Sequence, residues 1–231
     1  MKIALFSDIH ANLPAFEAFL ADLDSRKPDA VYCLGDMIGY NIWPDEIIEE
    51  IRRRGIATLA GNHDQKTKGF AYEIVSAGNR QYLNTLPSHI RLEFQLNQDH
   101  LNMVLAHGST RSINEYVLED TEAAYVLDMM QEAKADILCV GHSHKPYYRI
   151  LETGDNSFKR VINTGSVGKP KDGNPEGCYV LLTLTDDSST NKKESIQVEF
   201  IRFAYDIERA AKAIEDSPLP DELADRLRKA Y

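Results

Sequence analysis

The sequence feature that most constrains the fold is a short apolar run that ends directly in Asp, Asn or His, and it recurs along the chain. Its first three occurrences are residues 2–6 followed by Ser7-Asp8-Ile9-His10, residues 30–34 followed by Gly35-Asp36, and residues 56–60 followed by Gly61-Asn62-His63-Asp64. Residues 14–27 and 44–54, between these runs, carry apolar side chains at helical spacing. Alternating strands and helices predict a buried, mostly parallel sheet. Ligands of such sheets bind at the ends of the strands.

The rest of the chain predicts further strands and fewer helices. A helical pattern covers 65–87, and strands are expected at 90–96 and 101–106 around a turn at 97–100; the second strand ends at His107. A helix at 121–133 precedes a strand at 137–140, which ends in Gly141-His142-Ser143-His144. Strands at 147–151, 160–163, 179–184 and 196–203, a turn at 154–156, and helices at 207–215 and 221–229 complete the pattern. We therefore predict a single α/β domain over residues 1–231, with two packed mixed β-sheets flanked by helices.

The polar strand ends together predict a metal centre. A single His after a strand is usually a surface or core residue, but five of the seven histidines fall at such ends. Imidazole and carboxylate together suit Mn, Fe, Zn or Ni. The candidate ligands are Asp8, His10, Asp36, Asn62, His107, His142 and His144. Seven ligands are too many for one ion and suit two ions with a bridging carboxylate, which is the usual arrangement for hydrolysing phosphate esters.

Charge and composition narrow the class of partner. The formal net charge is −10, which disfavours long nucleic acids, and the apolar runs are too short to cross a membrane. Two dications would nevertheless make the predicted site locally positive, so that it attracts a small phosphate ester. The cysteines Cys33, Cys139 and Cys178 each lie in an apolar segment. They are expected to be reduced core residues of a cytoplasmic protein.

At these residues the sequence resembles the calcineurin-like metallophosphoesterase superfamily. That family's ordered motifs D-x-H, G-D, G-N-H-[DE], H and G-H-x-H all occur here, as Asp8-Ile9-His10, Gly35-Asp36, Gly61-Asn62-His63-Asp64, His107 and Gly141-His142-Ser143-His144. The small, single-domain bacterial branch is the most similar, through residues 35–40, 82–87, 163–168 and 205–207. The resemblance implies a four-layer α-β-β-α sandwich and two divalent ions, with Mn favoured.

The same resemblance implies a role for each motif residue. The first ion would be held by Asp8, His10, Asp36 and His144, and the second by Asp36, Asn62, His107 and His142. Asp36 would bridge the two ions. His63 would protonate the leaving group, and Asp64 would orient the imidazole of His63.

One departure from the family bears on the substrate. The protein-phosphatase branch has G-D-x-x-D-R-G, whereas this chain has Gly39-Tyr40-Asn41 where Asp-Arg-Gly would stand, so phosphoprotein substrates are disfavoured. The helical insertion at about 65–88 is expected near the active site. Candidate substrate contacts, each of which could equally be a plain surface-loop residue, are Asn12, Tyr40, Asn41, Lys169 and Lys171.

The predicted function is hydrolysis of small phosphate esters by attack of a metal-bridged hydroxide, with His63 as the general acid. Phosphodiesters, cyclic or dinucleotide ones included, and phosphomonoesters all fit the sequence. The alternative is a catalytically silent scaffold with the same fold, which would be free to lose His63. A nuclease on polymeric DNA is disfavoured by the charge and by the lack of a basic stripe. The sequence indicates neither the oligomeric state nor the physiological ester.

Overall fold

The first sheet is built around the N-terminal strand. The computed structural model describes residues 1–97, 99–154 and 156–231, so Gln98 and Asp155, in two of the expected turns, lie outside the described residues. In the first sheet the strands are ordered β10-β9-β1-β2-β3. Their bounds are β1 Lys2–Phe6, β2 Ala30–Cys33, β3 Ala57–Thr58, β9 Gly177–Thr183 and β10 Gln197–Phe203. β1, β2 and β3 are parallel because helices connect them, whereas β9 and β10 add antiparallel.

The second sheet has the same mixed character. Its order is β4-β5-β6-β8-β7. The bounds are β4 His89–Gln95, β5 His100–Ala106, β6 Ile137–Val140, β7 Tyr147–Glu152 and β8 Phe158–Asn163. The inner strands β5, β6 and β8 are parallel, and each edge strand pairs antiparallel with its neighbour. Within each sheet, therefore, the parallel strands end at the same edge.

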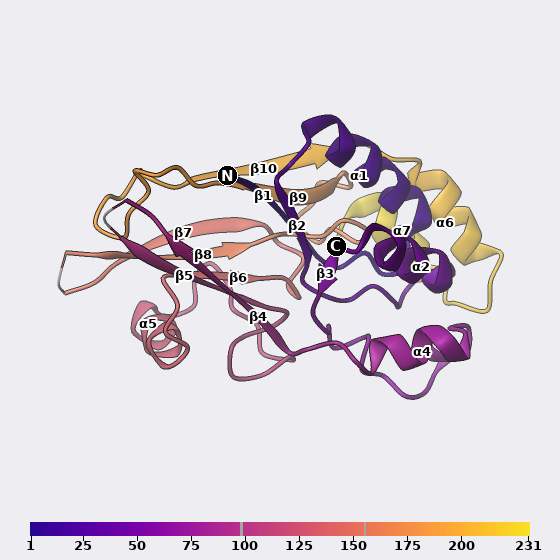
Figure 1. Ribbon diagram of the computed structural model, residues 1–231. Coiled ribbons are helices and arrows are strands. Elements are labelled where there is room, and N and C mark those ends of the chain that lie inside the picture. The colour runs from indigo at the N-terminus through magenta and orange to yellow at the C-terminus, as the bar shows by residue number, and fades with distance from the viewer. Residues whose placement is uncertain (98, 155) are drawn as a thin grey trace.

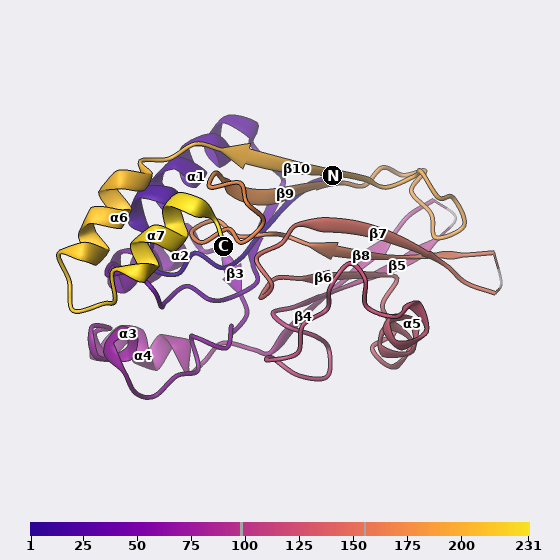
Figure 2. The same ribbon diagram turned by 180° about the vertical axis from the view of Figure 1, so that it is seen from behind.

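Side-chain alternation along the strands separates four layers. In β1, Ile3 and Leu5 pack between the sheets with Leu105 and other side chains of the second sheet, whereas Ala4 and Phe6 pack under the helices. The helices α1 (Leu13–Arg26) and α2 (Pro44–Arg54) cover the first sheet, and α5 (Ala123–Glu132) covers the far face of the second. Figures 1 and 2 show these layers from opposite sides. The predicted sandwich of two mixed sheets flanked by helices is confirmed.

Local sequence signals explain where several helices begin and end. The side chain of Asn12 accepts a hydrogen bond from the backbone of Ala15 and caps α1, and Gly55 ends α2 in the left-handed conformation. The helices α6 (Ile207–Glu215) and α7 (Glu222–Lys229) pack together through a small apolar cluster. They lie beside α1 in both views (Figures 1 and 2).

The segment expected to be helical over residues 65–87 contains two short helices instead. They are α3 (Phe70–Glu73) and α4 (Ala77–Leu83). The break has a capping cause, because the side chain of Ser76 accepts a hydrogen bond from the backbone of Asn79 and starts a new helix. Asn79 also bonds Asp45 and Arg52, which anchors α4 to α2.

The three cysteines and the lengths of the helices bear on two of the expectations from the sequence. Cys33, Cys139 and Cys178 are buried free thiols, as predicted, and burial raises the pKa of Cys178 to about 12. Within the described ranges, no helix combines the length and apolar character that a membrane crossing requires.

Candidate metal centre

The ligand side chains leave their strands through an unusual backbone conformation. Asp8, Asp36 and His142 have φ values of 55°, 57° and 64°, in the left-handed region that residues other than glycine seldom adopt. His10 and His144 share it, with φ values of 51° and 60°. These turns after β1, β2 and β6 bring the five side chains to one end of the sandwich. Clustered backbone strain of this kind is typical of functional sites.

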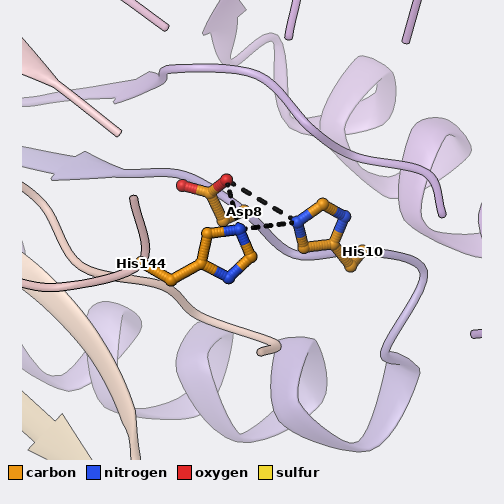
Figure 3. A group of neighbouring side chains, drawn as sticks. All are labelled: Asp8, His10 and His144. Atoms are coloured by element: carbon orange, nitrogen blue, oxygen red, sulfur yellow. Dashed lines mark hydrogen bonds and ion pairs between the residues drawn. The ribbon is translucent and has the colours of Figure 1, made fainter. Parts of the chain in front are cut away.

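One group of ligand atoms, the first cluster, comprises Asp8, His10 and His144. The Nε2 atoms of His10 and His144 lie 3.2 Å apart, and Asp8 Oδ1 lies 3.6 Å from the former and 3.2 Å from the latter. Figure 3 shows the two rings and the carboxylate pointing toward one another. The three side chains are almost completely buried. The end of β1 in the first sheet and the end of β6 in the second sheet therefore meet at this cluster.

A second cluster comprises Asp36, Asn62, His107 and His142. His107 Nε2 lies 3.4 Å from Asp36 Oδ2 and 3.0 Å from Asn62 Oδ1. Ligand atoms of Asp36, His107 and His142 all lie within 4.8 Å of one another. The same Asp36 Oδ2 lies 3.6 Å from His10 Nε2 of the first cluster. Asp36, a member of the second cluster, thus also lies within reach of the first.

Backbone carbonyls fix which ring nitrogen faces the clusters. His10 Nδ1 donates to the carbonyl of Ile38 at 3.0 Å, and His107 Nδ1 donates to that of Leu34 at 2.8 Å. His144 Nδ1 donates to the carbonyl of Lys169 at 2.5 Å. Since a neutral imidazole carries one N–H, these bonds leave the Nε2 atoms of His10 and His144 as lone pairs directed at the clusters, and they aim the Nε2 of His107 at Asp36. Metal-binding histidines are oriented by this kind of outer hydrogen bond.

The donor set fits divalent cations. Among the described residues, Asp8 Oδ1 is buried without a hydrogen-bond partner, although it faces two imidazole nitrogens. A buried acceptor of this kind is costly unless a cation or donor satisfies it. Lone pairs of His10 and His144 face each other at 3.2 Å, which is equally unfavourable without a positive charge between or beside them. Imidazole with carboxylate is the ligand mixture that Zn, Mn, Fe and Ni accept.

The pKa shifts of Asp36 and His107 show that the site favours positive charge. Burial alone would raise the pKa of Asp36, but the charge and hydrogen bond of His107, with His10 and His63, hold it well below its usual range. Burial lowers the pKa of His107, yet Asp36 outweighs it and raises that pKa to about 10. A proton on His107 thus offsets the carboxylate charge, a task that a bound cation would take over.

Two glycines allow the loops to approach this closely. A Cβ on Gly61 would lie 2.1 Å from Asp36 Oδ1, and one on Gly141 would lie 2.5 Å from the hydroxyl of Ser7. No larger residue fits at either position without moving the Asp36 or Asp8 loop. The glycines of the G-N-H-D and G-H-x-H motifs therefore serve packing rather than chemistry.

His63 lies beside the first cluster with its ring held from several sides. Its centroid is 4.9 Å from that of His10 and 4.7 Å from that of Tyr40, and Lys66 Nζ lies 3.0 Å from its Nδ1. A Cβ on Gly39 would lie 2.5 Å from the same Nδ1, so only glycine leaves room for this ring position. Burial lowers the pKa of His63 to about 4. The negative charge of a bound phosphate would raise it again.

Asp64 differs from the expectation that it orients the imidazole of His63. Its carboxylate accepts hydrogen bonds from the backbone N–H groups of Asp36 at 2.8 Å, Met37 at 2.9 Å and Gly61 at 2.9 Å, with a longer one from Ile38. No hydrogen bond from Asp64 to His63 occurs in the part of the chain that the structure describes. Asp64 is buried between two loops, where its carboxylate satisfies backbone N–H groups that need an acceptor. It ties the loop that carries Asp36 to the loop that carries His63.

Comparison with known proteins agrees with this geometry. A family model for the calcineurin-like phosphoesterase superfamily domain matches residues 1–187. The chain belongs to this superfamily. Membership implies a phosphoester hydrolase of a family that typically binds divalent metals, and the His and Asp clusters described above could hold such ions.

Several proteins match the chain along its length. An uncharacterized protein of Methanocaldococcus jannaschii is 30% identical over 253 residues, covering 97% of this chain and 96% of that protein. The crystal structure of a metallophosphoesterase from Sphaerobacter thermophilus is 27% identical with a TM-score of 0.76, covering 100% of this chain and 99% of that one. A hypothetical protein of Pyrococcus horikoshii OT3, 21% identical, has a TM-score of 0.78 over 100% of this chain and 98% of that one, which shows the shared fold.

The predicted substrate contacts differ in their surroundings. The buried side chain of Asn12 donates from its amide NH2 to the carbonyl of Gly168 at 2.8 Å, and its oxygen caps α1. Tyr40 packs edge-on against His10, with ring centroids 4.7 Å apart. Lys169 Nζ lies 4.7 Å from the centre of the Tyr40 ring. Lys171 lies close enough to lower the pKa of Lys169, which burial, the larger cause, brings to about 7.

Two of the predicted substrate-contacting residues have buried polar side-chain atoms that lack a hydrogen-bond partner among the described residues. Lys169 Nζ and both side-chain atoms of Asn41 lack a hydrogen-bond partner within residues 1–97, 99–154 and 156–231. Both residues lie next to Tyr40, Asn41 in sequence and Lys169 by ring contact. A buried ammonium without an anion is unfavourable, and a substrate phosphate would supply one.

Three residues outside the predicted set support the ligands. The Ser7 hydroxyl donates to Asp8 Oδ2, and that of Ser166 donates to the Asp8 carbonyl at 2.7 Å. Tyr116 stacks on His142, with ring centroids 4.2 Å apart and an interplanar angle of 13°. Ser7 and Ser166 could have been suspected from their places at the strand end and in residues 163–168. Tyr116 lies in a loop without a recognisable pattern.

Proposed function

We propose that this protein is a two-metal phosphoesterase that hydrolyses small phosphate esters. The observation that carries the proposal is the position of Asp36 Oδ2, which lies 3.6 Å from His10 Nε2 and 3.4 Å from His107 Nε2. One carboxylate oxygen shared by two clusters is what a bridging ligand requires. The first ion would be held by Asp8, His10, Asp36 and His144, and the second by Asp36, Asn62, His107 and His142.

The ions would supply the electrophile and the nucleophile. When bound, a pair of divalent ions polarises phosphoryl oxygens and lowers the pKa of water to about 7, so that hydroxide is available at neutral pH. The protein's part is to hold the ligands in place before the ions bind, which the bonds from Nδ1 atoms to backbone carbonyls support. Mn is the favoured metal, with Fe, Zn and Ni as alternatives.

His63 would protonate the leaving oxygen. The ring lies beside the first cluster, held by Gly39 and Lys66, and is more than nine-tenths buried. Because burial disfavours the imidazolium form of His63 and lowers its pKa, the substrate would help to charge the ring. A phosphate close to the ring would do so, because an adjacent anion favours the imidazolium.

The cationic side of the site would bind the anionic part of the substrate. Lys169 and Lys171 approach the clusters from the loop after Ser166, and Lys169 has no anion of its own among the described residues. The substrate class is small esters, phosphodiesters as well as phosphomonoesters. Long nucleic acids are disfavoured by the net charge of −10.

A panel of esters tests this proposal. The metal-stripped protein and the protein reloaded with Mn are assayed on matched mono-, di- and cyclic phosphoesters, with Asp36→Asn as the inactive control. We expect hydrolysis that needs added metal and is lost in the variant. Metal-loaded protein that hydrolyses none of the panel would contradict the proposal and favour the scaffold alternative.

A further inference from the structure

An aromatic ring forms part of the wall of the metal centre. Tyr116 belongs to the loop between β5 and α5, and its ring lies nearly parallel to the imidazole of His142, 4.2 Å between centroids. The tyrosine is nevertheless 53% exposed, which makes it one of the most exposed large apolar side chains. One face of the ring thus covers a proposed metal ligand, and the rest of it is open to solvent.

The loop holds Tyr116 in this position through its neighbours. The backbone carbonyl of Asn114 lies 3.3 Å from His142 Nε2, and the carboxylate of Glu115 accepts hydrogen bonds from Ser109 and Tyr125. With both of its oxygens engaged, Glu115 is fixed on the loop. Tyr116 therefore directly follows two anchored positions and needs little reordering to accept a ligand, which reduces the entropic cost of binding.

The two sides of the metal centre differ in chemistry. On the side of the first cluster, Tyr40 packs against His10 and carries Lys169 on its face, so that side suits negative charge. On the side of the second cluster, the open surface beside His142 is the neutral ring of Tyr116. An exposed aromatic face beside a phosphate site suits a planar, uncharged group, because stacking needs a flat π surface and no particular hydrogen bonds.

We propose that Tyr116 is a stacking platform for a heteroaromatic base, so that the substrate is a nucleoside phosphate ester. This inference rests on the proposed function and adds the organic part of the substrate to it. The phosphate lies at the clusters, and the base lies on the exposed face of Tyr116. The competing role, in which Tyr116 only supports His142, predicts equal effects on all esters.

The test compares two esters whose leaving oxygens are alike. A nucleoside 5′-phosphate and glycerol 3-phosphate both release a primary alkoxide, and only the former carries a base; a matched pair of diesters is run in parallel. For Tyr116→Ala, we expect the ratio of kcat/KM for the nucleoside ester to that for the glycerol ester to fall about tenfold, through KM. Tyr116→Phe keeps the ring and should keep the ratio. Phe200→Ala, which removes another exposed aromatic ring, on β10, is the matched control.

Each outcome has one meaning. A selective fall for the nucleoside ester, with metal content equal to that of the unmodified protein and with Tyr116→Phe restoring the ratio, supports the stacking platform. An unchanged ratio, an equal loss on both esters, or a loss of metal in Tyr116→Ala overturns it. Unmodified, metal-loaded protein that hydrolyses none of the esters contradicts the proposed function itself, which separates the two failures.

Discussion

At the scale of single residues, the ligands are oriented before any ion arrives. Three imidazole rings each donate from Nδ1 to a backbone carbonyl and direct Nε2 at the site; they belong to His10, His107 and His144. Asp8 and Asp36 leave their strands with left-handed φ values, which cost energy in a side-chain-bearing residue. Backbone strain of this kind is consistent with a site in which metal binding stabilises the strained conformation.

The role of His63 can be tested by the dependence on the leaving group. In His63→Ala we expect both metals to remain, because the ring lies beside the first cluster and is not needed to complete either proposed ligand set. Nitrophenyl esters should lose little activity, whereas alkyl or nucleoside esters should lose about 10²–10⁴-fold, since an alkoxide needs a proton to depart. Parallel metal analysis and steady-state assays measure this. Equal slowing of both ester types, or loss of a metal, would show that His63 is not the acid.

The bridging role of Asp36 can be separated from that of a terminal ligand. Asp36→Asn should lower activity and metal content more than His107→Asn does, because Asp36 is close to both clusters and its loss leaves the repulsion between the ions less screened. Both variants are compared by elemental analysis and by kcat. Equal effects of the two substitutions would argue against a bridge.

At the scale of elements, the strand ends explain why most of the site could be predicted. Every proposed ligand lies within a few residues after an apolar run, and parallel strands of one sheet end at the same edge. The bounds of α2 and β6 also matched the prediction, since capping residues and apolar periodicity mark them locally. Local signals of this kind are present in a single sequence.

What could not be predicted depends on contacts between distant segments. The partners of Asp64 lie on backbone at residues 36–38, and no pattern around Asp64 indicates them. Tyr116 meets His142 only because the loop after β5 comes close to the turn after β6. The split of 65–87 into α3 and α4 follows from the Ser76 cap, which a uniform apolar pattern conceals.

The revised role of Asp64 leads to a prediction about stability. Asp64→Asn places an amide NH2 against backbone N–H groups that need acceptors, so it should cost about 1–3 kcal/mol of unfolding free energy and loosen the Asp36 loop. Denaturant unfolding and metal analysis measure both effects. Asp24→Asn, which removes an exposed ion pair with Arg54, is the control and should cost less than about 1 kcal/mol. Unchanged stability with a selective loss on alkyl esters would restore the view that Asp64 orients His63.

At the scale of the whole molecule, the fold and the metal centre rest on different forces. The inter-sheet core is apolar, and among the described residues it includes Ile3, Leu5, Leu105 and Val180 at complete or near-complete burial. The clusters lie at one end of this core. Hydrophobic burial does not depend on the ions, whereas the site's electrostatics do.

Removing the metals should therefore abolish hydrolysis and leave the fold standing. We expect the circular dichroism spectrum of the stripped protein to match that of the loaded protein, and its Tm to rise as Mn is added, since an ion that binds only the folded state stabilises it. Leu182→Ala, in the inter-sheet core on β9, a strand that carries no proposed ligand, should lower the Tm of both forms alike. A stripped protein without ordered secondary structure would show that the ions are needed for folding.

The most direct test of the two-metal account is a metal titration of active protein. The stripped protein is reconstituted with increasing Mn, and bound metal and hydrolysis of one ester are measured on the same samples. The account predicts that activity reaches its plateau at two ions per chain and that Asp36→Asn does not reach it. Full activity with one ion per chain, or with none, would contradict it.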